Sequence, residues 1–81
     1  MIVKILGPGC ANCKKLERTT RDAIAELGLD ATLEKVEDYP TIAAYGIMAT
    51  PGLVVDETVV VSGRVPKLAE IKDLLTTAAS V

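Results

Sequence analysis

A short apolar run that ends at a Gly-Pro-Gly turn, followed at once by a long amphipathic segment, most constrains this fold. Residues 1–6 are mostly apolar and partly β-branched, which predicts a buried strand. Gly7-Pro8-Gly9 ends that strand, because glycine and proline interrupt regular structure. From Ala11 to about Leu27 apolar residues recur at helical spacing, and Gly28 supplies a C-terminal stop. The chain is therefore expected to begin as strand, loop and helix.

The rest of the chain predicts an α/β domain with the order β-α-β-α-β-β-α. Asp38 is placed to cap the second helix. Only Asp56-Glu57 separates the last two strand patterns, which predicts a hairpin. Strands joined through a helix pair in parallel and hairpin strands pair antiparallel, so a mixed four-stranded sheet with helices on both faces is expected. The predicted elements are strand 1–6, helix 11–27, strand 31–36, helix 39–45, strands 53–55 and 58–61, and a helix that Pro66 opens.

Composition excludes several classes of protein. The 81 residues make one domain, 1–81, and their 49% apolar content supplies one modest core. A net charge of −2, without a run of Lys and Arg, gives no sign of nucleic-acid binding. No apolar stretch reaches the roughly 18 residues that a membrane span needs. The opening residues lack the basic start and long apolar centre of a signal peptide, so a cytoplasmic protein without a membrane partner is expected.

Cys10 and Cys13, the only cysteines, lie where the first predicted strand gives way to the first predicted helix. A helix N-terminus presents unpaired N–H groups and a partial positive charge, and both favour a thiolate. The thiolate is the nucleophile and the metal ligand of cysteine chemistry. The ring that this pair could close is too short to brace the fold, so a reversible disulfide or a metal is the expected use. Histidine is absent, which argues against a self-contained zinc site.

Two alternatives stay open at this point. Both cysteines could be small buried hydrophobes, and Cys13 does share the phase of the apolar helix face, although Cys10 does not. Lys14 and Lys15 stand in the first helical turn, where the macrodipole prefers acids. Lys14 is expected to favour the thiolate, and the alternative is that both lysines are solvated surface residues.

A first strand that ends in CxxC, a helix, and a later X-Pro that leads into a hairpin and a last helix follow one another along the chain. Taken together, these features resemble the thioredoxin/glutaredoxin superfamily, and in particular its small archaeal and bacterial redox-active disulfide proteins. The segment Tyr45–Pro51 resembles the stretch that ends in the cis-proline of thioredoxins. The resemblance covers essentially the whole chain. It implies a thiol–disulfide oxidoreductase whose partners are a disulfide-containing protein or small thiol and an upstream reductase, with no cofactor beyond the Cys10–Cys13 disulfide.

The resemblance also implies roles for individual residues. Cys10 would attack a substrate disulfide and Cys13 would resolve the mixed disulfide, with backbone amides of Cys10 and Ala11 stabilising the thiolate. Thr50 and Pro51 would shape the substrate cleft, and the bond between them would be cis, whereas the sequence without the resemblance favours a trans proline. The other substrate-binding positions are Gly9, Ala11 and Asn12, and no metal-binding residue is implied.

Some positions depart from the family pattern. Gly9 stands where thioredoxins usually carry Trp, and Lys4 stands where they hold a buried acid. Lys4 therefore either points away from the cysteines or tunes them in the opposite sense. The paired glycines and following acid with which glutaredoxins bind glutathione are missing after the hairpin. The alternative function is a soft-metal carrier that holds Cu(I) through the same CxxC, but such domains run β-α-β-β-α-β.

Overall fold

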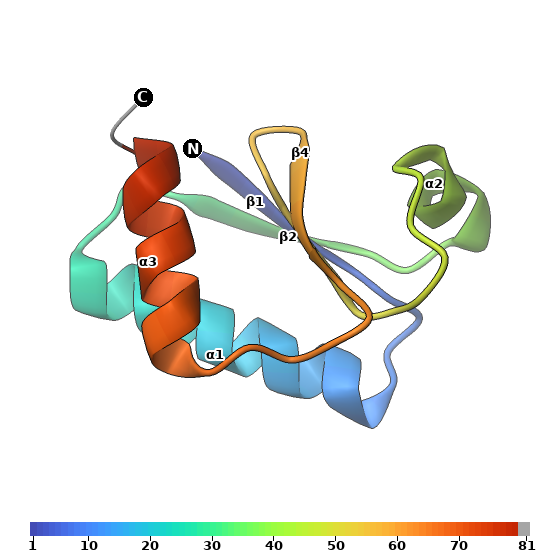
Figure 1. Ribbon diagram of the computed structural model, residues 1–81, viewed down its shortest axis with the longest axis horizontal. Coiled ribbons are helices and arrows are strands. Elements are labelled where there is room, and N and C mark those ends of the chain that lie inside the picture. The colour runs from blue at the N-terminus through green and yellow to red at the C-terminus, as the bar shows by residue number, and fades with distance from the viewer. Residues whose placement is uncertain (80–81) are drawn as a thin grey trace.

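The computed structural model describes residues 1–79 and has the predicted order of elements (Figure 1). Each observed boundary lies within two residues of the predicted one. The elements are β1 (Ile2–Leu6), α1 (Ala11–Leu27), β2 (Thr32–Val36), α2 (Tyr39–Ala44), β3 (Gly52–Val55), β4 (Thr58–Ser62) and α3 (Leu68–Ala79).

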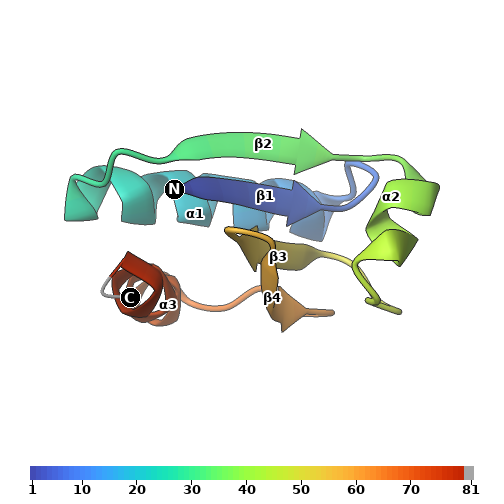
Figure 2. The same ribbon diagram turned by 90° about the horizontal axis from the view of Figure 1, so that it is seen from above.

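The four strands form one mixed sheet in the order β2-β1-β3-β4 (Figure 2). β1 runs parallel to β2, with Ile2 opposite Thr32 and Leu6 opposite Val36. β3 is antiparallel to both β1 and β4. The loop after Leu6 therefore leaves the sheet from a central strand, and this loop carries the two cysteines to the start of α1.

Side chains on β1 alternate between the two faces of the sheet, as the pleat of a strand requires. Val3 and Ile5 belong to the main core, which α1 and α3 cover, and Figure 1 shows these two helices together on one side of the strands. Leu6 belongs to a smaller core on the other face, where it packs with Ile42 of α2 and Val54 of β3. The expected helices on both faces are thus confirmed.

Local signals set most helix ends. Gly28, with a φ of 64°, caps α1, and its N–H donates to the Ala25 carbonyl. The Asp38 side chain accepts a hydrogen bond of 3.0 Å from the Thr41 amide and caps α2. The start of α3 corrects the sequence expectation: the Lys67 carbonyl accepts the first helical hydrogen bond, from Ile71, so Pro66 precedes the helix and its buried ring packs instead of opening the first turn.

The β3–β4 turn adopts a backbone that its residues do not favour. Asp56 and Glu57 have φ values of 47° and 68°, a region that residues other than glycine seldom occupy. Two hydrogen bonds hold Asp56 to the first strand: its carboxylate accepts from the Ile2 amide, and its own amide donates to the Ile2 carbonyl, both at 2.8 Å. The turn is therefore fixed by β1 as well as by its own sequence.

Candidate active site

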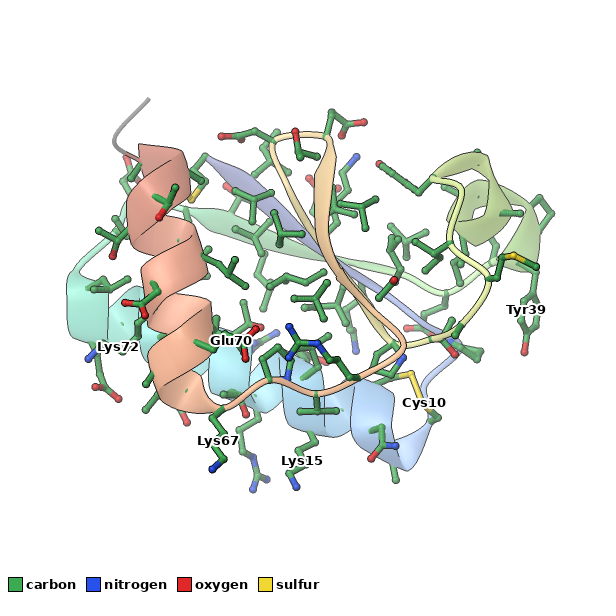
Figure 3. The ribbon with its side chains drawn as sticks, viewed as in Figure 1. Cys10, Lys15, Tyr39, Lys67, Glu70 and Lys72 are labelled. Carbon is green, nitrogen blue, oxygen red and sulfur yellow. A yellow bond between two sulfur atoms is a disulfide. The ribbon has the colours of Figure 1, made fainter. Side chains whose placement is uncertain are left out.

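Cys10 and Cys13 are joined in a disulfide across the first turn of α1, with their Cα atoms 5.0 Å apart (Figure 3). Cys10 is the N-cap residue, with extended backbone at φ −68° and ψ 168°. Its Sγ accepts a hydrogen bond of 3.1 Å from the Cys13 amide. A side chain at this position normally accepts from the second or third amide of the helix, so the sulfur takes the place of a capping oxygen. The helix N-terminus thus has its positive end at Cys10.

The two sulfurs differ in their access to solvent. Cys10 is exposed, whereas only 4% of Cys13 is exposed. The helical phase of Cys13 predicts this difference, because Cys13 lies on the side of α1 that carries Leu16 into the core. In the disulfide, the Cys10 sulfur accepts its hydrogen bond from the Cys13 amide. Stabilisation of the thiolate by the amides of Cys10 and Ala11 concerns the reduced protein and stays a prediction. Cys10 is open to solvent at the start of α1, whereas Cys13 lies against the core.

Gly7 brings the backbone after β1 against the buried sulfur. A methyl group at this position would overlap Cys13 Sγ and would lie 3.9 Å from Pro51 Cα. Only a residue without a side chain fits between Cys13 and Pro51. The sequence marks Gly7 as a strand terminator but gives no sign of this close approach.

The end of the Tyr45–Pro51 segment lies close to Gly7 and the buried Cys13 sulfur. The Thr50–Pro51 peptide bond is cis, as the resemblance implies. Pro51 is buried and Thr50 is half-buried, and the Pro51 carbonyl accepts a hydrogen bond of 2.8 Å from the Gly63 amide. Gly7 thus packs between Pro51, which immediately precedes β3, and Cys13 in the first turn of α1. The remaining positions that the resemblance implies for substrate binding are exposed around Cys10: Gly9, Ala11 and Asn12.

A polar cavity of about 320 Å³ adjoins the buried sulfur. Its charged side chains come from α1 and from the end of β2, and Lys35 Nζ lies 3.7 Å from Glu17 Oε1 and 4.0 Å from Glu37 Oε1. Sequence reasoning finds only Lys14 among these charges, although Glu17 follows Cys13 by one helical turn. The lining residues are Ile5, Gly7, Gly9, Cys13, Lys14, Glu17, Lys35 and Glu37.

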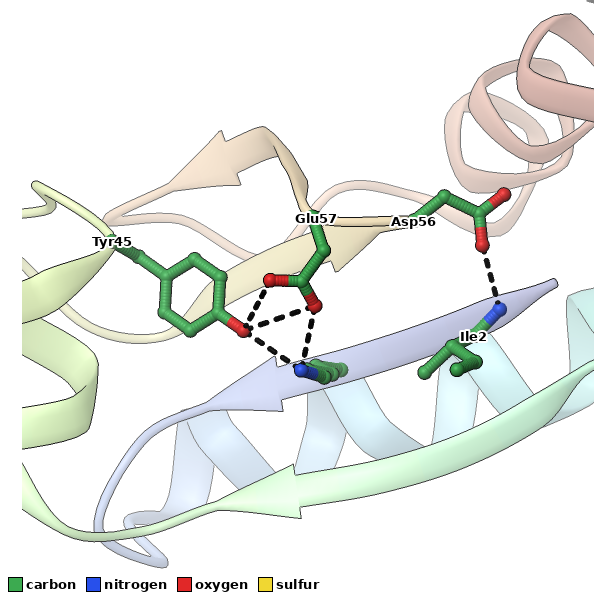
Figure 4. Close-up of polar contacts among 5 residues, drawn as sticks. Ile2, Tyr45, Asp56 and Glu57 are labelled. Carbon is green, nitrogen blue, oxygen red and sulfur yellow. Dashed lines mark hydrogen bonds and ion pairs between the residues drawn. The ribbon is translucent and has the colours of Figure 1, made fainter.

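Lys4 points away from the cysteines, which decides between its two expected positions. Its ammonium donates to Glu57 Oε1 at 2.7 Å and to Tyr45 Oη at 2.9 Å (Figure 4). These hydrogen bonds, the one to Glu57 first, raise the pKa of Lys4, and the bond from Lys4 lowers the pKa of Glu57. Lys4 therefore stays charged on the α2 side of the sheet, opposite the face that α1 covers.

Residues 1–79 contain neither a candidate metal site nor a membrane-spanning helix. In this part of the chain, no three His, Cys, Asp or Glu side chains gather as a metal site. No described helix is long and apolar enough to cross a membrane. The element order also differs from the β-α-β-β-α-β order of soft-metal carriers.

The chain is similar over most of its length to known proteins of one family. The family model described as a thioredoxin domain matches residues 1–76. A thioredoxin from Methanothermobacter thermautotrophicus is 45% identical over 75 residues, which are 93% of this chain and 97% of that protein. A thioredoxin from Methanocaldococcus jannaschii is 36% identical over 75 residues, 93% of this chain and 86% of that protein. The exposed and buried sulfurs at the start of α1 lie within the matched residues.

Proposed function

The chain belongs to the thioredoxin family and is a thiol–disulfide oxidoreductase, and from this premise we propose how its residues divide the reaction. Cys10 is the attacking thiolate and Cys13 is the resolving thiol. The observation that carries this assignment is the difference in exposure: Cys10 is open to solvent at the helix N-cap, and Cys13 is 4% exposed beneath it.

The exchange conserves atoms and electrons. In the reduced protein, the Cys10 thiolate attacks a substrate disulfide; a bond forms from Cys10 to one substrate sulfur, and the other leaves as a thiolate that takes a proton. Cys13 then loses its proton to water and attacks Cys10 Sγ, so the Cys10–Cys13 bond forms and the second substrate thiol is released. The substrate gains two electrons and two protons, and an upstream reductase returns two electrons to the protein.

The start of α1 favours the ionised form of Cys10. The positive end of the helix and the Cys13 amide both stabilise negative charge on its sulfur. Lys14, one residue after Cys13, adds a nearby positive charge and lines the cavity beside Cys13. Because these groups act on the thiolate and not on the thiol, they make Cys10 of the reduced protein a better nucleophile at neutral pH.

In this proposal the half-buried Thr50 and the exposed residues around Cys10 form the substrate surface, and the buried Pro51 shapes it by holding the Thr50 backbone in place. Those exposed residues are Gly9, Ala11 and Asn12, and the small Gly9 and Ala11 leave room for a protein chain. The partners are disulfide-containing proteins and an upstream reductase, and the dithiol couple itself carries the electrons without a further cofactor. Residues 1–81 act as one domain, in the cytoplasm, where other thiols are kept reduced.

Single-cysteine variants test the division of roles. Cys10→Ser should abolish reduction of insulin, because the remaining sulfur is buried. Cys13→Ser should form mixed disulfides that persist, since nothing displaces the bound substrate, and mass spectrometry should detect them. Thr19→Ser, farther along α1, should reduce insulin at the rate of the unsubstituted protein. Continued activity of Cys10→Ser, or a Cys13→Ser variant that accumulates no mixed disulfide, would contradict the assignment.

A further inference from the structure

The charges on α1 are arranged against the helix macrodipole. Lys14, Lys15 and Arg18 occupy its first two turns, and this helix has no acidic residue in its first turn. The last turn has no basic residue, and Glu26 stands there instead. A helix is stabilised by acids near its N-terminus and bases near its C-terminus, so each of these placements is unfavourable for the helix itself. Departures of this kind from local preference are expected where a surface serves function.

The same three cations have no partner within the described part of the chain. Five of the nine Lys and Arg residues form an ion pair there, namely Lys4, Arg21, Lys35, Arg64 and Lys72. The other four side chains are exposed, and three of these lie at the cysteine end of α1: Lys14, Lys15 and Arg18. We refer to these three residues as the α1 cationic surface. Three cations without an ion-pair partner therefore lie at the Cys10 end of α1, in a chain whose net charge is −2. The nearby acid Glu17 is itself paired with Arg21 and Lys35.

The α1 cationic surface lies close enough to Cys10 to attract a negatively charged partner toward its sulfur. With a rise of about 1.5 Å per residue, Lys15 is roughly 8 Å and Arg18 roughly 12 Å from Cys10 along the helix axis. The Debye length at physiological ionic strength is about 8 Å, so the field of Lys15 reaches a molecule at the sulfur. Arg18 lies beyond that distance and acts on the part of a protein partner that covers the second turn of α1. Figure 3 shows Lys15 on the same helix as Cys10, projecting outward from the molecule.

We propose that the α1 cationic surface is a docking surface for redox partner proteins that carry acidic residues next to their disulfide or dithiol. This inference rests on the proposed function, because only a partner in disulfide exchange must approach Cys10. A protein partner fits better than a nucleic acid: the surface spans two helical turns, and the acids elsewhere on this negatively charged chain would repel a long polyanion. The surface therefore selects partners and accelerates their encounter.

Three synthetic peptides test the proposal. Each has the same length and one intramolecular disulfide, flanked by four Asp, four Ser or four Lys residues. The measurement is the second-order rate constant for reduction of each peptide by pre-reduced protein. We expect the Asp peptide to react about tenfold faster than the Ser peptide at low ionic strength, the lower end of the range for electrostatic steering. The difference should vanish near 1 M salt, where the Debye length is about 3 Å.

Variants locate the effect. Lys15→Glu/Arg18→Glu should remove the preference for the Asp peptide and leave the rate with the Ser peptide unchanged; Lys14 is kept because it acts on the thiolate. Lys72→Glu is the control, because Lys72 pairs with Glu26 at 3.1 Å, roughly 24 Å along α1 from Cys10. This variant should retain the preference.

Two results would overturn the docking proposal: equal rates for the three peptides with unsubstituted protein, or an undiminished Asp preference in Lys15→Glu/Arg18→Glu. A protein that reduces none of the peptides, the Ser peptide included, would instead contradict the proposed function on which this inference rests.

Discussion

Cys10 and Cys13 at the start of α1 have identical side chains in different surroundings. Cys10 precedes the helix in extended conformation and is exposed, and Cys13 lies one turn later on the buried side. Residues three positions apart within a helix share a face, so the extended backbone of Cys10 at the N-cap is what separates the two sulfurs. Gly7 allows Cys13 to be buried, because the backbone at Gly7 lies directly against Cys13 Sγ.

Gly7→Ala tests this packing at the scale of one methyl group. The added Cβ would overlap Cys13 Sγ, and Pro51 closes the other side, so the start of α1 must shift. Overpacking of this kind typically costs about 1–3 kcal/mol, and we expect urea unfolding of the oxidised protein to show a loss in that range. The displaced sulfur should also slow disulfide exchange.

Gly46→Ala is the matched control for Gly7→Ala. Gly46 has a φ of 80°, and a Cβ there would meet no atom within 4 Å, so its substitution strains the backbone without touching the cysteines. It should lower stability and leave the exchange rate unchanged. If Gly7→Ala exchanged disulfides at the unsubstituted rate, the role assigned to Gly7 would be wrong.

At the scale of elements, the β3–β4 hairpin shows how one strand can stabilise a turn that another pair of strands makes. Asp56 and Glu57 both occupy the left-handed region, which their side chains disfavour. Asp tolerates this region better than most residues, and its carboxylate accepts a hydrogen bond from the amide of Ile2 on β1. The turn and the first strand therefore support each other.

Asp56→Ala should destabilise the turn in two ways. Alanine disfavours the positive φ at this position, and it has no carboxylate to accept the hydrogen bond from the Ile2 amide. We expect a loss of about 1–2 kcal/mol in the free energy of unfolding, measured with urea. Asp73→Ala, an exposed position on α3, provides the comparison and should change stability little. Equal stabilities of the two variants would show that β1 does not hold the turn.

At the scale of the whole molecule, charge is divided between the two faces of the sheet. On the α2 side, Lys4 of β1 joins Tyr45, just after α2, to Glu57 in the hairpin turn. This cluster links three segments that are distant in the sequence. On the α1 side, Lys35 and the acids around it lie beside Cys13, and the α1 cationic surface faces solvent. The position that holds an acid near the cysteines in other thioredoxins therefore serves the opposite face here.

The Lys4–Glu57 contact makes stability depend on pH. The folded protein lowers the pKa of Glu57, so this residue stabilises the fold above its unfolded pKa of about 4.3, and that contribution is lost as pH falls through the folded value. The pKa of Lys4 is raised, so its contribution is present below about pH 10.4 and is lost as pH rises through the folded value.

Lys4→Met should remove this dependence. The unsubstituted protein should lose stability more steeply than the variant on acidification below about pH 4.3, as urea unfolding at a series of pH values would show. Disulfide exchange by the variant should match that of the unsubstituted protein, because Lys4 lies on the far face from Cys13. A variant with altered exchange kinetics would place Lys4 in the active site after all.

The amino-acid sequence by itself determined the elements, their order and the cysteine pair. Periodicity, caps and breakers act over a few residues, so residues 11–27 predict α1 and Asp38 predicts the start of α2 without knowledge of the fold. The start of α3 is the exception. Pro66 is favourable at a helix start, but its ring is buried, and the first helical hydrogen bond is accepted at Lys67.

Only the tertiary structure decided which distant residues meet. Lys4 bonds to Tyr45 and Glu57, 41 and 53 positions away, and no local pattern encodes such a pairing. The same holds for the contact of Gly7 with Cys13 and Pro51, and for the cavity where Glu17 meets Lys35. These contacts depend on which strands pair and on which face each side chain emerges, so they exist only once the sheet has assembled.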